Sequence, residues 1–491
     1  MGTDGLRRWG LNRFIFCPVQ NTAPPNQDIS PHIQLPTDLG SIFLELYFRR
    51  VHPLVPIVDY ATISETWVQS NTASAVDIDP LNYHQLKLVL AIGAFVAGRS
   101  QGGDPDAGEK WAKILLKRAT ERIDLFSEIS LAKIQFIVLR AVYAMHNCHV
   151  DEAYMYLGHA ARCAIASGLN RSEITDEQQS NTHKMRLTFW VLYYLERQSS
   201  LFSGRQSAFQ DDHIDTHFPE EVQYDSRTSA YPSPSIQCAW VRPMAELARV
   251  AGKVLTLSTP STKSRTADLV TLVEVLQECE WLMRGIQNGL LPYLNFQHPA
   301  QPIGEEWQEV QRTHLGLMYH LTRVIMYRPL LQFRSLFPTV EDSQAFAAPS
   351  SANIQAGIAS SIESSKLMIQ LAYDVYSRRC PEVMYDTRIM SCSVYACVTL
   401  LYNILDPGPE NDIAQVRETI DTVGLAVQCL NSVSNVRTAV AAQISTDIVD
   451  SVKAAWTAAG YTVDLDPGLI DILPWLIYFT PDGLFDPPAP S

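Results

Sequence analysis

The sequence lacks an excess of basic residues. Its 491 residues include 38 Lys and Arg against 52 Asp and Glu, a formal net charge of −14. A surface of that sign repels the phosphate backbone of nucleic acids, so DNA or RNA binding would require a local basic element. Only residues 1–22 come close to such an element, with three arginines and one aspartate. The composition therefore excludes a chain that binds nucleic acid through its overall charge.

Cysteines are few, and long apolar runs are missing. The nine cysteines are odd in number and scattered through apolar helical sequence, so we expect reduced core thiols and no disulfide framework. The longest apolar stretch, residues 86–98, contains Lys87 and is shorter than the roughly 20 residues that span a bilayer. Residues 14–17 are too short an apolar run for a signal peptide. These absences predict a soluble protein of a reducing compartment with no membrane partner.

Apolar side chains recur with a helical period along most of the chain, and strand-like alternation is scarce. Residues 86–96 are apolar on all sides, which predicts a central helix. Gly168 is expected to end a helix that contains residues 156–165, and Pro53 is expected to force His52 out of helical geometry. We predict an all-α fold, a large irregular bundle of roughly a dozen or more helices. Further helices are expected near residues 39–47, 111–123, 134–145, 179–203, 237–257, 266–288, 305–328, 354–378, 386–405 and 411–432.

Motifs that would indicate catalysis have simpler structural explanations. Residues 103–110 resemble a phosphate-binding loop, but the lysine falls one place late and two aspartates would repel phosphates. Ser130 and Lys133 have the spacing of an activated serine, yet Ser130 is better explained as a helix N-cap. Residues 211–217 alternate Asp and His as metal ligands could, although such short acidic loops are more often solvated. We therefore predict no catalytic site, no metal site and no cofactor in this chain.

One buried carboxylate is predicted within residues 179–206. Phe189 and its apolar neighbours define the inner face of a helix, and the same helical progression places Glu196 on that face. Burying an unpaired carboxylate costs several kcal/mol, so we expect an arginine within reach. Simple core architecture is one interpretation; a ligand or partner pocket is the other. The candidate pocket residues are His159, Arg162, Trp190, Glu196 and Arg205, with Arg205 or Arg162 as the expected ion-pair partner.

Several segments together resemble one protein family. Residues 46–59, LYFRRVHPLVPIVD, resemble the opening of the regulatory middle-homology domain of fungal binuclear zinc-cluster transcription factors. Residues 156–171 are similar to the central helix of that domain and its Gly-Leu-polar-Arg end. Residues 186–205 resemble its most recognisable block. Tyr319-His320 and residues 327–330 look like its tyrosine-histidine helix that ends in Arg-Pro.

The resemblance implies three regions. Residues 1–36 are expected to form an irregular N-terminal arm. Residues 37–460 would be the helical regulatory domain, with the strongest match over 37–220 and a weaker one to about 431. Residues 461–491 would form a C-terminal tail.

The zinc-cluster module of that family is not found in these 491 residues. The family pattern needs six cysteines among basic residues, and Cys17 is the only cysteine before Cys148. The resemblance implies zinc for the family, but this chain is expected to bind none. DNA contact would then come through a missing module or a partner, and the chain could be a fragment, a gene model without its first exon, or a regulator that works through another protein.

The C-terminal tail combines acidic and aromatic side chains. No Lys or Arg follows Lys453, and five aspartates alternate with apolar residues. Such a composition is typical of a transcriptional activation segment, while a final helix packed on the core is the alternative. The candidate activation residues are Asp471, Trp475, Phe479 and Phe485.

The resemblance implies a nuclear regulator of RNA polymerase II transcription that senses a metabolite or a partner. A metabolic or secondary-metabolite gene set is the expected target, with the transcription machinery or a co-regulator as partner, a small-molecule inducer as ligand and a homodimer as the assembly. Two alternatives stay open. One is a helical adaptor or repressor without direct DNA binding; the other is an all-α enzyme of secondary metabolism, for which we find no acid/base constellation.

Overall fold

A computed structural model describes most of the central part of the chain. The described residues are 34–72, 79–100, 102–121, 123–147, 149–177, 181–219, 238–258, 269–298, 301–334, 351–381, 387–404 and 413–432, with four more between 450 and 457. Within these ranges there are fourteen α-helices and no strand or sheet. The all-α prediction is confirmed.

The first helices cover the residues up to 213. They are α2 (Thr37–Leu46), the π-helical turn η1 (Tyr47–Val51), α3 (Tyr60–Ser70), α4 (Pro80–Arg99), α5 (Pro105–Thr120), α6 (Leu131–His146), α7 (Val150–Ala166), α8 (Ser172–Glu177), α9 (Thr182–Ser203) and the short η3 (Asp211–His213).

The later helices are longer on average. They are α10 (Cys238–Ser258), α11 (Leu269–Asn288), the short η4 (Pro292–Leu294), α12 (Glu306–Arg334), α14 (Ser351–Asp374), the π-helical turn η5 (Val375–Arg379), α15 (Thr387–Ile404) and α16 (Ile413–Ser432).

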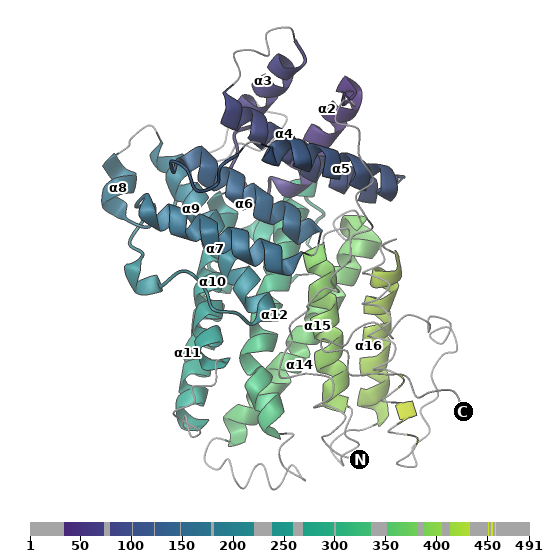
Figure 1. Cartoon of the computed structure of the whole chain (residues 1–491). Helices are drawn as coiled ribbons and strands as arrows, with labels where there is room; N and C mark the ends of the chain where they lie inside the picture. The colour runs from purple at the N-terminus through teal and green to yellow at the C-terminus, as the bar shows by residue number, and fades with distance from the viewer. Residues whose placement is uncertain are drawn as a thin grey trace, which may run out of the picture.

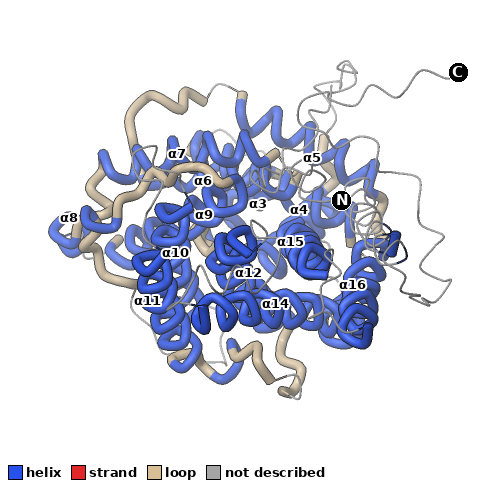
Figure 2. Tube along the Cα trace, turned by 90° about the horizontal axis from the view of Figure 1, so that it is seen from below, coloured by secondary structure: helices blue, strands red, loops and turns tan. Residues whose placement is uncertain are grey.

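The helices form two groups around a continuous apolar core. In Figure 1 the helices from α10 onward run side by side in the lower part, and α4 to α7 lie across their upper ends. The view from below shows α12 surrounded by α10, α14 and α15 (Figure 2). One cluster of buried side chains extends from Leu35 to Leu430, so both groups share the same core.

Helix α4 is the central helix of the upper group. It packs against α2, α3, α5 and α6. Every residue from Gln85 to Phe95 is buried, because the sequence is apolar on all sides and each side meets another helix. The prediction from residues 86–96 is confirmed.

Two predicted helix ends are confirmed. Ser130 precedes α6, and its hydroxyl accepts a hydrogen bond from the backbone N–H of Lys133 at 3.2 Å. Gly168 follows α7 with φ of +70°, a left-handed conformation that glycine adopts without steric cost.

The predictions at two prolines were wrong. His52 keeps helical angles, φ −57° and ψ −36°, although Pro53 follows. Its backbone N–H donates to the carbonyl of Tyr47, and its buried ring contacts the carbonyl oxygen of Val58 at 2.9 Å, so these bonds outweigh the local preference. Helix α12 likewise continues through Pro329 to Arg334 instead of ending there.

Two short helices were not predicted. Helix α3 contains only three buried residues among eleven, and α8 is six residues long, so neither gives a clear apolar period. Both depend on tertiary packing for their stability.

The six cysteines whose side chains are described are buried thiols, as predicted. Among the described residues, none of the helices has the length and apolar character of a membrane span.

Candidate regulatory site

Glu196 lies on the buried face of α9, as the sequence predicted. Its residue is 1% exposed. The Ser207 hydroxyl donates to Oε2 at 2.6 Å, and the backbone N–H of Ala208 donates to Oε1 at 2.7 Å. The Ser200 hydroxyl donates to Oε1 at 3.2 Å. Burial raises the pKa of the Glu196 carboxyl, and these bonds, together with the neighbouring positive charge of Arg197, oppose part of that rise.

The predicted arginine partner of Glu196 was wrong. Arg205 donates to Asp151 of α7 and lies 5.1 Å from the centre of the Tyr154 ring. Arg162 donates to the Gly158 carbonyl of its own helix at 3.2 Å. The loop that follows α9 turns back over the helix, so hydroxyl and backbone N–H groups reach the carboxylate and satisfy its hydrogen bonds without an ion pair to Arg205 or Arg162.

The same loop is held to α9 by the next residue of the helix. Arg197 Nη2 donates to Asp211 Oδ1 and to the carbonyl of Phe209, both at 2.9 Å. The Tyr193 hydroxyl donates to the same Asp211 oxygen at 2.6 Å. A Cβ at Gly252 of α10 would lie only 2.4 Å from Arg197 Nη1, so the glycine makes room for the guanidinium. Glu196 and Arg197, two adjacent residues of α9, therefore both bond to the loop at residues 205–213.

Trp190 and His159 contact different parts of the chain. Trp190 Nε1 donates to the His217 carbonyl at 2.9 Å, and its ring stacks on Phe218 at 4.3 Å. The His159 ring lies 4.8 Å from Phe126. Among the described contacts none joins Trp190 to His159, so a shared ligand pocket stays a prediction.

The acidic loop at residues 211–217 serves as structural support. Asp211 accepts the bonds from Arg197 and Tyr193, and Asp215 accepts one from the backbone N–H of Ser172 at 2.8 Å. In the described part of the chain, no three His, Cys, Asp or Glu side chains are grouped so that they could hold a metal ion.

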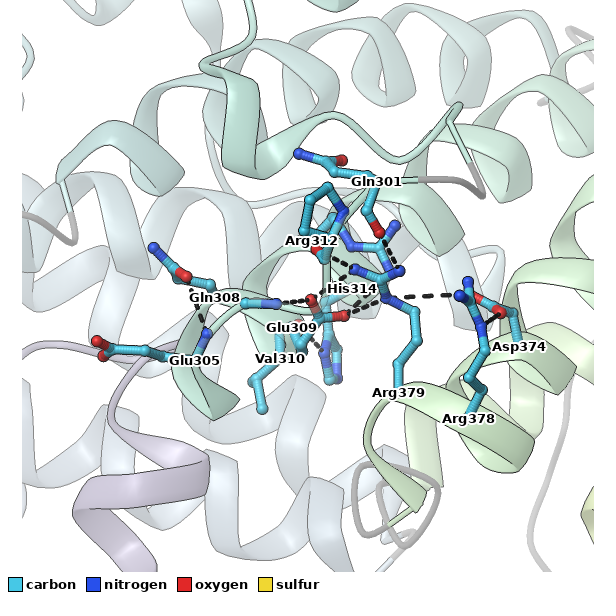
Figure 3. Close-up of polar contacts among 12 residues, drawn as sticks. Gln301, Glu305, Gln308, Glu309, Val310, Arg312, His314, Asp374, Arg378 and Arg379 are labelled. Carbon is cyan, nitrogen blue, oxygen red and sulfur yellow. Dashed lines mark hydrogen bonds and ion pairs between the residues drawn. The ribbon is translucent and has the colours of Figure 1, made fainter.

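A second buried carboxylate, Glu309 of α12, was missed in the sequence (Figure 3). Arg379 at the end of η5 donates to both of its oxygens, from Nε at 2.7 Å and from Nη2 at 2.8 Å. Arg312 Nη2 donates to Oε2 at 3.0 Å, and the Gly304 backbone N–H donates to Oε1 at 2.8 Å. The side chains of Glu309, Arg312 and Arg379 are 3%, 2% and 0% exposed.

The charges around Glu309 determine its ionisation. Burial alone would raise the pKa of this carboxyl, but the hydrogen bonds from Arg379 and Gly304 and the charges of both arginines lower it to about 2. Arg379 also donates to the carbonyls of Gln301 and Pro302, at 2.8 Å and 2.9 Å. The sequence shows Glu309 and Arg312 one helical turn apart, whereas Arg379 lies seventy positions later.

The start of α12 also holds the N-terminal part of the described chain. Arg49 and Arg50 of η1 both bond to Glu306, from their Nε atoms at 2.6 Å and 3.1 Å. One turn further, Gln311 Nε2 donates to the Pro53 carbonyl at 2.8 Å. Segments 256 to 258 residues apart in the sequence therefore meet next to the Glu309 cluster.

The chain matches one protein-family model over part of its length. Residues 44–283 match the fungal specific transcription factor domain. This part of the chain belongs to that family. The match includes three of the segments that carry the resemblance, residues 46–59, 156–171 and 186–205, while the segment at residues 319–330 lies outside it.

Curated relatives of the chain are fungal transcriptional regulators. It is 28% identical over 192 residues to an uncharacterized transcriptional regulatory protein of Schizosaccharomyces pombe, covering 38% of this chain and 24% of that protein. It is 24% identical over 218 residues to a negative regulator of pleiotropic drug resistance of Candida glabrata, with 42% and 22% covered. It is 22% identical over 354 residues to a transcriptional activator of Neurospora crassa, with 70% and 37% covered.

The matched part of the chain spans about a quarter of the length of the first of these relatives. No solved structure matches the chain. Residues 1–33 of the predicted arm and the candidate activation residues Asp471, Trp475, Phe479 and Phe485 lie outside the described residues.

Proposed function

We propose that the chain is the regulatory part of a fungal transcription regulator, acting in the nucleus on a set of genes transcribed by RNA polymerase II. The family domain at residues 44–283 is the observation that supports this function most strongly. One relative is named a negative regulator and another an activator, so the direction of the effect on transcription is not common to the family.

The proposed role of the helical domain is to receive a co-regulator, part of the transcription machinery or a small-molecule inducer. Glu309 supports this role, because it joins segments that are seventy residues apart in the sequence. A helical body held together in this way can carry the effect of binding from one helix to another. The proposal includes no catalytic step, in keeping with relatives that are regulators.

Sequence-specific DNA contact is proposed to come from a zinc-cluster module outside these 491 residues or from a partner protein. The net charge of −14 and the single cysteine before Cys148 support the proposal that the helical domain itself does not contact DNA. Zinc would belong to that module and not to the helical domain.

A reporter assay tests the proposal. The full chain is fused to a heterologous DNA-binding domain, and transcription from a promoter with the matching sites is compared with that of the DNA-binding domain alone. We expect a severalfold change in either direction. A second fusion without residues 461–491 separates the contribution of the tail from that of the helices. A fusion that accumulates in the nucleus and leaves the reporter unchanged would contradict the proposal.

A further inference from the structure

Lys133 of α6 has a buried ammonium group whose described partner is a neutral hydroxyl. The residue is 7% exposed, and its Nζ donates to the hydroxyl of Ser127 in the loop before α6. Among the described contacts, no carboxylate pairs with this ammonium. Buried charges in proteins are ordinarily paired, because taking an ion out of water costs several kcal/mol. Within the described part of the chain, the charge of Lys133 therefore lacks a counter-charge.

The Ser127 hydroxyl that this ammonium reaches lies on an exposed loop. Residues 126–130 are all exposed. The hydroxyl donates to the Asp124 carbonyl at 3.0 Å and accepts from Lys133. In the described structure, no backbone–backbone hydrogen bond joins residues 123–129 to another segment. An exposed loop of this kind is accessible to an enzyme that modifies side chains.

The first turn of α6 also attracts negative charge to this place. Ser130 caps the helix, and its hydroxyl accepts the backbone N–H of Lys133 at 3.2 Å. The start of a helix carries a partial positive charge, because its first backbone N–H groups have no partner within the helix. Since Lys133 belongs to this turn and bonds to Ser127, a negative group on the Ser127 oxygen would lie beside both positive charges.

We propose that Ser127 is a phosphorylation site and that Lys133 binds the phosphoryl group. Ser127 Oγ attacks the γ-phosphorus of a nucleoside triphosphate held by a protein kinase. The Oγ–P bond forms, the bond to the departing nucleoside diphosphate breaks, and the hydroxyl proton passes to a base of the kinase. The phosphoserine has a charge of about −1.5 to −2 and three strong acceptor oxygens. It gives Lys133 an ion-pair partner and fixes the loop to α6.

The charges beside Ser127 indicate an acidophilic kinase. Asp124 precedes the serine by three residues and Glu128 follows it directly, and both are exposed. A kinase with a basic substrate groove is complementary to them. The two carboxylates also repel a phosphate, but solvent screens them, and Asp124 Oδ1 accepts the backbone N–H of Phe126 at 2.9 Å. The attraction of the buried Lys133 is screened less.

Phosphorylation of the purified full chain tests the site. The chain is incubated with ATP and either casein kinase 1 or casein kinase 2, both acidophilic, and tandem mass spectrometry locates the phosphate. We expect phosphate at Ser127, and Ser127→Ala should lose most of the phosphate that the wild type incorporates. Ser130→Ala is the matched control, because it removes another exposed serine of the same loop and should keep the modification.

A ³¹P NMR titration tests whether Lys133 binds the phosphate. Ser127 is replaced by phosphoserine during translation of the full chain, in the wild type and in Lys133→Met. A neighbouring positive charge favours the dianion, so the phosphate should lose its second proton about one pH unit lower in the wild type than in Lys133→Met. Lys113→Met is the control: it removes an exposed lysine that pairs with Glu109 and should keep the wild-type midpoint. Circular dichroism confirms that each variant stays folded.

Three outcomes would overturn the proposal. One is a chain in which both kinases leave Ser127 unmodified. Another is a phosphoserine that ionises at the same pH in the wild type and in Lys133→Met, which would show that the ammonium does not bind the phosphate. The third is an unmodified chain that binds inorganic phosphate and loses this binding in Lys133→Met, which would assign the ammonium to a free anion.

Discussion

Glu196 and Glu309 are equally well buried but are stabilised in opposite ways. Glu196 is 1% exposed and Glu309 2%. Glu196 receives two hydroxyl groups and one backbone N–H, and burial raises the pKa of its carboxyl. Glu309 receives two guanidinium groups, and its pKa falls to about 2. Burial therefore does not determine the ionisation of a carboxylate; the charge of its partners does.

The difference has structural consequences. The bonds of Glu196 hold a loop only eleven and twelve residues away in the sequence. The ion pairs of Glu309 connect α12 to η5, seventy residues away, next to the contacts that attach η1. The Glu309 cluster is therefore expected to stabilise the whole helical body, whereas the Glu196 centre stabilises one loop.

The largest loss of stability is expected for Glu309→Gln. The change removes the carboxylate that bonds to both buried arginines and leaves Arg379 only the more distant Asp374, at 3.9 Å; breaking a buried ion pair in this way typically costs about 3 to 5 kcal/mol in the free energy of unfolding. Denaturant titration followed by circular dichroism measures it. Glu45→Gln is the control, since Glu45 is 54% exposed and its pair with Arg49 should contribute less than about 1 kcal/mol. Equal losses of stability in Glu309→Gln and Glu45→Gln would show that the buried ion pairs of Glu309 contribute no more than an exposed one.

A smaller loss is expected for Arg197→Met. Met keeps part of the packing but removes the donors to Asp211 and to the Phe209 carbonyl, so we expect about 2 kcal/mol. Proteolysis within residues 205–213 should become faster in the same variant, because this loop loses its attachment to α9. A loop as resistant as that of the wild type would show that Arg197 does not hold it.

Glu196→Gln should cost only about 1 kcal/mol. The amide oxygen can still accept the bond from the Ala208 N–H, and the amide nitrogen can donate to the Ser207 hydroxyl, so no buried charge is left unpaired. Glu128→Gln, an exposed change, is the control for the same thermal or denaturant measurement. A loss as large as that of Glu309→Gln would indicate a charged partner that the structure does not show.

Arg162→Gln should change the stability of the monomer least, by about 0.5 kcal/mol or less, because this side chain is exposed and bonds to its own helix. In denaturant titration the variant should unfold like the wild type. A loss of several kcal/mol would revive the ion pair with Glu196 that the sequence predicted.

The helical fold could be predicted from the sequence because apolar periodicity and helix ends depend on residues that are close together in the chain. Residues 86–96 are apolar on every side, and all of them from Leu86 to Phe95 are buried in α4. The cap at Ser130 and the end at Gly168 also depend on neighbouring residues only. The helical angles of His52 depend on contacts that no local pattern contains.

For the two carboxylates, too, only what depends on nearby residues could be predicted from the sequence. The burial of Glu196 follows from the apolar face of its own helix, and the sequence predicted it. Its partners depend on how the loop after α9 turns back, so the expected arginine was wrong. The Glu309 cluster needs Arg379, which η5 brings to α12 from seventy residues away, and a single sequence contains no signal for that contact.

The pH dependence of the two Glu→Gln variants tests most directly whether partner charge, and not burial, sets the behaviour of these carboxylates. Because the folded-state pKa of Glu309 lies below the ordinary 4.5, its stabilisation is full above pH 4.5 and is lost as the pH falls toward 2. Because the folded-state pKa of Glu196 is raised, its contribution is full below pH 4.5 and is lost as the pH rises through the folded value.

The measurement is the free energy of unfolding of the wild type and both variants at pH 7 and at about pH 3.5. The advantage of the wild type over Glu309→Gln should shrink at the lower pH, and its advantage over Glu196→Gln should grow. Two differences that move in the same direction with pH would contradict the account.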